Sequence, residues 1–344
     1  MEFGIYTFVE NTFDPVSGKK IEADERISNM LAEAELAEQL GLDVYAVGEH
    51  HRPDFLISSP AVVLAAIAAR TKKIRLSSAV TVLSSDDPVR VFQDFATIDL
   101  LSNGRAEIMA GRGSFIESFP LFGYDLNDYD ELFSEKLDLL LKIRDSEIIS
   151  WRGHHRAAIN NLGVYPRPVQ KQLPVWIAVG GTPQSVSRAA KLGLPLALAI
   201  IGGNPAQFRP LIQHYKNSYK EAGHGNNPQV GINTHAFIAE DSSKASDTFF
   251  PSYADAMTRI GRERGWSGMT REHYEAMRAP GGSLMVGSPD EVIEKILYEY
   301  ELFGFTRFLA QMSVGSLPHA AMMKSIELFA TVVVPAVKKH LKDR

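Results

Sequence analysis

The chain of 344 residues alternates short β-branched or apolar runs with longer segments of helical periodicity, and the alternation occurs eight times. A short apolar run is typical of a buried strand, whereas apolar residues three and four apart are typical of one helix face. Eight strand-helix units favour an α/β fold, the closed (β/α)8 TIM barrel, over a doubly wound open sheet. Barrels of this size are single domains, so we expect residues 1–344 to form one domain.

The boundaries of the units follow from the apolar runs and from the prolines and glycines between them. The expected strands are 3–9, 43–48, 74–83, 106–110, 174–179, 196–200, 229–239 and 307–312. The expected helices are 24–40, 60–69, 89–101, 129–144, 183–192, 205–222, 289–303 and 318–337.

Two segments do not fit the alternation. Residues 148–169 are expected to form a small hairpin inserted before the fifth strand. Residues 242–285 are polar and rich in glycine, and we expect them to form short helices and a lid after the seventh strand. Long insertions of this kind are usually functional or mobile.

Composition excludes several classes of protein. The chain has no cysteine, which excludes a thiolate nucleophile, a disulfide and a cysteine-rich zinc site. A net charge of -5 without long runs of Lys or Arg argues against a nucleic-acid partner. The longest apolar stretch, 192–201, is far shorter than the roughly 20 residues of a membrane span. The first residues lack the basic start and apolar core of a signal peptide, so we expect a cytoplasmic protein.

Barrel enzymes carry their chemistry at the carboxyl ends of the strands. Glu49, His50 and His51 follow the second expected strand. They fit a hydrogen-bonded group at a strand end, or a general acid or base, because histidine exchanges a proton near neutral pH. Neighbouring strand residues point to opposite faces, so the two histidines would not face one ion, and we expect no metal.

Two glycine-containing loops are candidates for binding an anion. Gly111-Arg112-Gly113-Ser114 follows the fourth expected strand and offers one guanidinium. The segment from Gly180 to Ser185 follows the fifth strand and begins a helix, with Thr182 as N-cap and Pro183 in the first turn. The free N–H groups at such a helix start favour a phosphate, although an ordinary capped helix needs no ligand.

Five segments together resemble, in order, motifs of the bacterial luciferase-like family of flavin-dependent monooxygenases, and the resemblance covers essentially the whole chain. The segments are Val44-Tyr45-Ala46-Val47-Gly48-Glu49-His50-His51; 83–90, ending in Asp87-Pro88-Val89-Arg90; Leu100-Leu101-Ser102-Asn103-Gly104-Arg105 with Gly111-Arg112-Gly113; Gly180-Gly181-Thr182-Pro183-Gln184-Ser185; and Gly287-Ser288-Pro289-Asp290-Glu291-Val292.

The resemblance implies a TIM barrel with an insertion after the seventh strand and assigns roles to particular residues. His50 matches the catalytic histidine, and Ala79-Val80, on the third strand, matches a cis peptide beside the flavin ring. The residues that match the phosphate site are Arg112, Gly180, Gly181, Thr182 and Ser185. Gly111 stands where the luciferases have a reactive cysteine and Asp87 where they have histidine, so light emission is not implied.

The implied activity is an FMN-dependent monooxygenase. Reduced FMN, supplied by a separate flavin reductase, would react with O2, and one oxygen atom would pass to a small organic substrate while the other leaves as water. The resemblance also implies a homodimer. Three alternatives stay open: an F420-dependent hydride-transfer enzyme of the same fold, a non-catalytic flavin-binding protein, and a metal-dependent barrel hydrolase.

Overall fold

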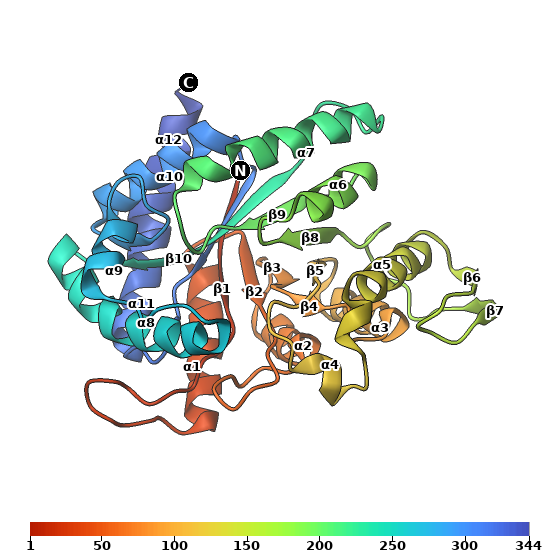
Figure 1. Cartoon of the computed structure of the whole chain (residues 1–344), viewed down its shortest axis with the longest axis horizontal. Coiled ribbons are helices and arrows are strands. Elements are labelled where there is room, and N and C mark those ends of the chain that lie inside the picture. Colours follow the sequence, from red (N-terminus) through yellow and green to blue (C-terminus); the bar gives the residue numbers. More distant parts are fainter. Residues whose placement is uncertain (344) are drawn as a thin grey trace.

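The structure, a computed structural model that describes residues 1–343, is built on a closed barrel of eight parallel strands (Figure 1). The strands are β1 (Glu2–Thr7), β2 (Val44–Val47), β3 (Arg75–Ser78), β5 (Ala106–Gly111), β8 (Val175–Val179), β9 (Leu196–Ala199), β10 (Val230–Ile238) and β12 (Arg307–Gln311). The barrel closes because β10 pairs with both β9 and β12. The expected TIM barrel is confirmed.

Helices surround the barrel, and side-chain caps begin two of them. The surrounding helices are α1 (Ala23–Gln39), α2 (Pro60–Arg70), α3 (Pro88–Ser102), α5 (Tyr129–Asp145), α6 (Pro183–Lys191), α7 (Arg209–Glu221), α10 (Pro289–Phe303), α11 (His319–Leu328) and α12 (Val334–Lys342). Asp87 caps α3 by accepting from the N–H groups of Val89 and Arg90. Ser288 and Glu291 form a capping box at the start of α10.

The third strand is interrupted, where the sequence predicts one strand over 74–83. β3 ends at Ser78, and the short strand β4 (Thr81–Val82) resumes pairing with β5. The peptide between them, Ala79–Val80, is cis, as expected. The prediction of a single strand was wrong because the apolar run includes residues 79 and 80, which do not pair with a neighbouring strand.

The two insertions lie on opposite sides of the barrel (Figure 1). The expected hairpin within 148–169 is confirmed as β6 (Ile148–Trp151) paired antiparallel with β7 (Ile159–Gly163). After β10 come α8 (Ser242–Arg264), α9 (Arg271–Arg278) and β11 (Met285–Gly287), which extends the sheet beside β10.

The expectation of only short helices in 242–285 was wrong, because α8 is one helix of 23 residues. Its polar outer face and Pro251 obscured the apolar inner face in the sequence. That inner face carries Phe249, Tyr253 and Ala256, all buried in a hydrophobic cluster of their own. Burial of this face, rather than the helix propensity of its residues, stabilises α8.

Within residues 1–343, one continuous helical stretch has the length and apolar composition of a membrane span. It runs from His319 to Lys342, and 44% of its most apolar window is buried. Phe329, Val333 and Val337 of this stretch belong to the main hydrophobic core. A closing helix packed against a barrel has the same composition as a membrane helix, so this feature is weak evidence for a membrane.

An ionic network closes the amino-terminal end of the barrel. Arg307 of β12 pairs with Glu107 of β5, and both side chains are almost completely buried. Arg307 also donates to Glu2 of β1 at 2.8 Å and 2.6 Å, and its guanidinium lies 4.2 Å from the ring centre of Trp176 on β8. The network therefore joins four strands that are distant in sequence.

We predict that Arg307→Met lowers the free energy of unfolding by about 3–5 kcal/mol, because it leaves Glu107 buried with most of its compensation removed. Urea unfolding measures the change. Combining Arg307→Met with Glu107→Leu should recover most of the loss, since neither charge is then buried alone.

The control is Arg70→Met, which removes an exposed pair with Glu35 (3.3 Å). Exposed pairs contribute about 0–1 kcal/mol. If Arg307→Met is no more destabilising than this control, the network does not stabilise the barrel.

Candidate active site

The predicted site residues follow several strands at one end of the barrel. His50 follows β2, Arg112 follows β5, and Thr182 follows β8 as the first turn of α6 begins. Because the strands are parallel, all three positions lie at the carboxyl end, which is where barrel enzymes place their active sites.

His50 lies in an aromatic enclosure. The centre of its ring is 4.7 Å from that of Phe8, 4.4 Å from that of Phe55 and 4.6 Å from that of Phe115. Its Nδ1 lies 3.6 Å from a carboxylate oxygen of Glu117, and only 10% of its side chain is exposed. The imidazole is therefore shielded from water on its ring faces and has one carboxylate partner.

Glu117 is a partner that the sequence reasoning missed. Burial opposes ionisation of this carboxyl, but the hydrogen bonds from His50 and from the backbone N–H of His51 lower its pKa. An ionised Glu117 favours a proton on His50 Nδ1, which leaves Nε2 as the nitrogen that can exchange a proton with a ligand. Nothing in the sequence around residue 117 shows this contact.

Glu49 and His51, on either side of His50, have partners of their own. A carboxylate oxygen of Glu49 accepts the N–H of Val82 on β4, and the other lies 4.0 Å from His51 Nε2. Burial, reinforced by the charge of Asp86, raises the pKa of Glu49 to about 8. Burial lowers the pKa of His51. At neutral pH this pair is therefore largely uncharged, and His50 faces a different partner.

The second part of the site is a cationic cradle formed by Arg112, Thr182 and Arg188. Arg112 donates to the hydroxyl of Thr182 at 2.9 Å and pairs with the exposed carboxylate of Asp130 at 2.6 Å. Arg188 of α6 has a buried guanidinium nitrogen, Nη1, without a hydrogen-bond partner. Burial, and then the positive charge of Arg112, lower the pKa of Arg188. Two neighbouring guanidiniums and an unpartnered donor suit a multiply charged anion.

The two glycines before Thr182 leave space beside this cradle. A side chain built at Gly180 would meet nothing within 4 Å, and Gly181 has a φ of +119°. The hydroxyl of Thr182 does not cap α6. Ser185 is buried, and its N–H donates to the carbonyl of Thr182 at 3.1 Å. Of the two hydroxyls predicted to bind phosphate, those of Thr182 and Ser185, the Thr182 hydroxyl is hydrogen-bonded to Arg112.

The Ala79–Val80 peptide lies between the two parts of the site. A Cβ at Gly48 would stand 2.5 Å from the carbonyl oxygen of Ala79, and a Cβ at Gly111 would stand 2.7 Å from Val80. Gly48 precedes His50 by two residues, and Gly111 directly precedes Arg112. Both glycines are therefore needed for close packing around this peptide, and Gly111 could not be a cysteine without movement of Val80.

The far end of α8 is held over the aromatic enclosure by two ion pairs and one hydrogen bond, which we call the lid contacts. Arg52 forms an ion pair with Glu263, and Arg259 donates to Asp54 at 2.8 Å. Arg264 donates to the carbonyl of Ser114 at 2.6 Å. These contacts hold the insertion after β10 against the loops that carry His50 and Phe115.

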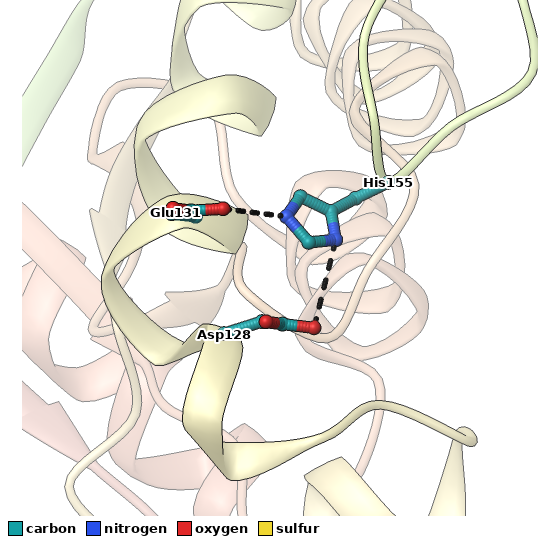
Figure 2. A group of neighbouring side chains, drawn as sticks. All are labelled: Asp128, Glu131 and His155. Carbon is teal, nitrogen blue, oxygen red and sulfur yellow. Dashed lines mark ion pairs between the residues drawn. The ribbon is translucent and has the colours of Figure 1, made fainter.

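One cluster among the described residues has ligands that could hold a metal ion. Figure 2 shows His155, from the loop between β6 and β7, between Asp128 and Glu131. Nδ1 of His155 lies 3.9 Å from Asp128, and Nε2 lies 3.5 Å from Glu131. Each nitrogen of the imidazole is directed at a different carboxylate, so in this structure His155 bridges Asp128 and Glu131 (Figure 2).

Fold and site together define a (β/α)8 barrel with neighbouring arginines and a shielded histidine at the carboxyl end of its strands. The family model of the luciferase-like monooxygenases matches residues 1–307. The chain belongs to this family, as the five motifs indicate, and the expected enzyme class, a flavin-dependent monooxygenase, is confirmed at the level of the family.

Curated relatives cover nearly the whole chain. The alkanal monooxygenase alpha chain of the Kryptophanaron alfredi symbiont is 25% identical, over 98% of this chain and 99% of the relative. The oxygenase component of a flavin-dependent trigonelline monooxygenase from Acinetobacter baylyi is 22% identical, over 100% of this chain and 98% of the relative.

Solved structures show the same fold. Monooxygenase RslO1 from Streptomyces bottropensis has a TM-score of 0.84 at 24% identity, covering 98% of this chain and 99% of the other. The oxygenating constituent of 3,6-diketocamphane monooxygenase from Pseudomonas putida, in complex with FMN, has a TM-score of 0.78 at 19% identity, covering 98% of both chains. An F420-dependent secondary alcohol dehydrogenase has a TM-score of 0.77 at 18% identity, also covering 98% of both chains.

We predict that Glu49→Gln gains stability relative to the parent chain as pH rises. Unfolded, a glutamate ionises near pH 4.5, whereas folded Glu49 keeps its proton up to about pH 8. Ionisation of the unfolded chain between these values therefore destabilises the parent, and the amide removes this loss. The difference in unfolding free energy should grow by about 3 kcal/mol from pH 5 to pH 8.

Denaturant unfolding at several pH values measures the difference. The control is Glu22→Gln, an exposed position at the start of α1 with no side-chain cap, which should give a flat difference. A flat difference for Glu49→Gln as well would show that burial does not hold the proton on this carboxyl.

Proposed function

We propose that this protein is an FMN-dependent monooxygenase that uses reduced flavin and O2 to oxygenate a small organic substrate. The observation that carries the proposal is the placement of the Ala79–Val80 peptide between an anion cradle and a shielded histidine. A flavin mononucleotide has a phosphate at one end and a flat ring at the other, so it needs these two features in one site. When bound, reduced FMN supplies the electrons and the reaction with O2.

The cradle would hold the phosphate. Arg112 and Thr182 are already joined, Arg188 has an unpartnered N–H, and Gly180 and Gly181 leave room for backbone approach. The start of α6 adds the positive end of the helix dipole, and Ser185 lies in its first turn. Asp130 opposes the phosphate, since it occupies one side of Arg112.

His50 would exchange a proton with the substrate or the flavin through Nε2, while Glu117 holds the ring through Nδ1. The phenylalanines around His50 exclude water and offer an apolar surface to the substrate. The lid contacts keep α8 over this enclosure, which limits solvent access during reaction. Aromatic walls of this kind accept many apolar molecules, so they set a substrate class and not one compound.

The alternative is hydride transfer with F420, and the fold shared with an F420-dependent alcohol dehydrogenase supports it. Both cofactors carry a phosphate and a flat ring, so the cradle alone does not separate them. The distinguishing observation is O2 consumption, which only the monooxygenase requires. We also propose a separate flavin reductase as the source of reduced FMN, a homodimer and a cytoplasmic location; these stay predictions.

The first test is anaerobic titration with reduced FMN, followed by addition of O2. We expect binding and O2 uptake when an organic substrate is present. Arg112→Lys should weaken binding by about 10- to 100-fold, because the paired N–H donors to the phosphate are lost.

Asp130→Asn is the matched variant on the other side of Arg112, and it should tighten binding by about two- to fivefold, because a competing charge is removed. Failure to bind FMN in either redox state, with binding of F420, would replace the proposal by the alternative.

We predict that His50→Gln lowers oxygenation by about 10²- to 10⁴-fold, the usual contribution of a general acid or base. Binding of reduced FMN should stay within about twofold, since His50 is not in the cradle. Turnover and binding are measured separately on the same preparation. Glu117→Gln should retain more activity than His50→Gln, because it removes only the positioning partner. Unchanged turnover in His50→Gln would show that His50 is not the general acid or base, and binding of FMN without any turnover in the parent chain would indicate a non-catalytic flavin-binding protein.

A further inference from the structure

A cavity of about 270 Å³ lies outside the site described above. Its walls come from the segment after β1, from α1 and from the segment between β12 and α11. Its volume is near the lower end for small-molecule pockets, about 300–1,000 Å³. None of the residues assigned to the flavin or to catalysis lines it.

Three consecutive residues of this cavity have polar atoms without a partner. Glu10 and Asn11 are 6% and 4% exposed, and Thr12 is 9% exposed. No hydrogen bond reaches Glu10 Oε2, Asn11 Oδ1 or Thr12 Oγ1 within the described chain. Buried polar atoms are nearly always hydrogen-bonded, whereas these three atoms lack a hydrogen-bonding partner within the described chain.

The charges around the cavity favour a cation. Four carboxylates line it together with two permanent cations, Lys19 and Arg26, and Arg26 is already paired with Glu33 at 3.0 Å. Glu10 has only a neutral partner, Gln311, which donates to its other oxygen at 3.1 Å. When its carboxylates are ionised, the cavity therefore carries an excess of negative charge.

We propose that this cavity binds a small organic cation with a primary ammonium group. An ammonium has three N–H donors and no acceptor, so it can donate to unpartnered oxygens of the cavity lining, such as those of Glu10 and Asn11. The rest of the cavity takes the organic part. This site is additional to the proposed flavin site and does not depend on it.

A metal ion is a poorer occupant. Among the described residues, the groups that bring metal-ligand atoms within 4.8 Å of one another are limited to Asp128, Glu131 and His155, and none of them lines the cavity.

The position of Glu10 links the cavity to the wall of the aromatic enclosure. Glu10 forms an isolated antiparallel bridge with Phe55, whose ring packs against His50 at 4.4 Å. A ligand held by the Glu10 side chain would therefore contact the residue whose backbone pairs with Phe55.

Binding of an ammonium should depend on pH through Glu10. Burial raises its pKa to about 8, Arg26 of α1 and Arg259 of α8 lower it, and Asp54 raises it. Tyr6 of β1 also faces this carboxyl. A bound cation favours the ionised form, so binding at pH 7 releases a proton and affinity rises about tenfold from pH 7 to pH 9.

The test is isothermal titration of the full chain, without flavin, with n-butylammonium chloride. We expect saturable binding that strengthens about tenfold between pH 7 and pH 9, with proton release seen in buffers of different ionisation enthalpy. Glu10→Gln keeps an oxygen for Gln311 but removes the charge, so it should weaken binding at pH 9 at least about tenfold. The control Glu22→Gln, exposed and outside the cavity, should bind like the parent.

Three results would overturn the proposal. The first is absence of saturable heat at millimolar probe, which means that the cavity holds water only. The second is equal binding of n-butanol, the neutral isostere. The third is affinity in the parent chain that does not change with pH, a result that is independent of whether Glu10→Gln folds. Because flavin is absent, none of them bears on the proposed monooxygenase activity.

Discussion

The buried pair of Arg307 and Glu107 is the constraint on which the rest of the barrel depends. Two opposite charges inside a barrel are tolerable only if they meet, so β5 and β12 must stand in the registers that bring them together. Glu2 extends this requirement to β1. With the amino-terminal end held in this way, the strands emerge at the other end in fixed positions. The loops there can then differ in length without changing where His50 and Arg112 stand.

The barrel could be predicted from the sequence because the apolar periodicity of strands and helices is recognisable over each whole element, even where single residues depart from it. Features that depend on three-dimensional packing were misplaced. The run 74–83 has the composition of one strand, and the break at Ala79–Val80 lies closely packed against Gly48 and Gly111, which are distant in sequence. Likewise α8 carries Pro251 and many polar residues, and only burial of its aromatic face makes it a single helix. Such packing is long-range and leaves no local pattern.

The site divides in the same way. Positions directly after strands could be predicted, because topology alone brings them to one end of the barrel. Their partners could not: Glu117 reaches His50 across 67 positions of sequence, and Asp130 and Arg188 approach Arg112 from two different helices. An ion pair between distant elements needs only one residue on each side, and a single charged residue in a sequence is not distinguishable from a solvated one.

The charge state around His50 follows from burial more than from the number of acidic residues nearby. Glu10 and Glu49 are both buried at the mouth of the barrel, and burial raises the pKa of each to about 8. Glu117 is less buried and has hydrogen-bond donors, which lower its pKa. At neutral pH it is therefore the ionised carboxylate beside the imidazole, and the field at His50 comes chiefly from a group on the loop after β5. That loop also carries Arg112. One segment therefore supplies both the carboxylate beside His50 and the guanidinium beside Thr182.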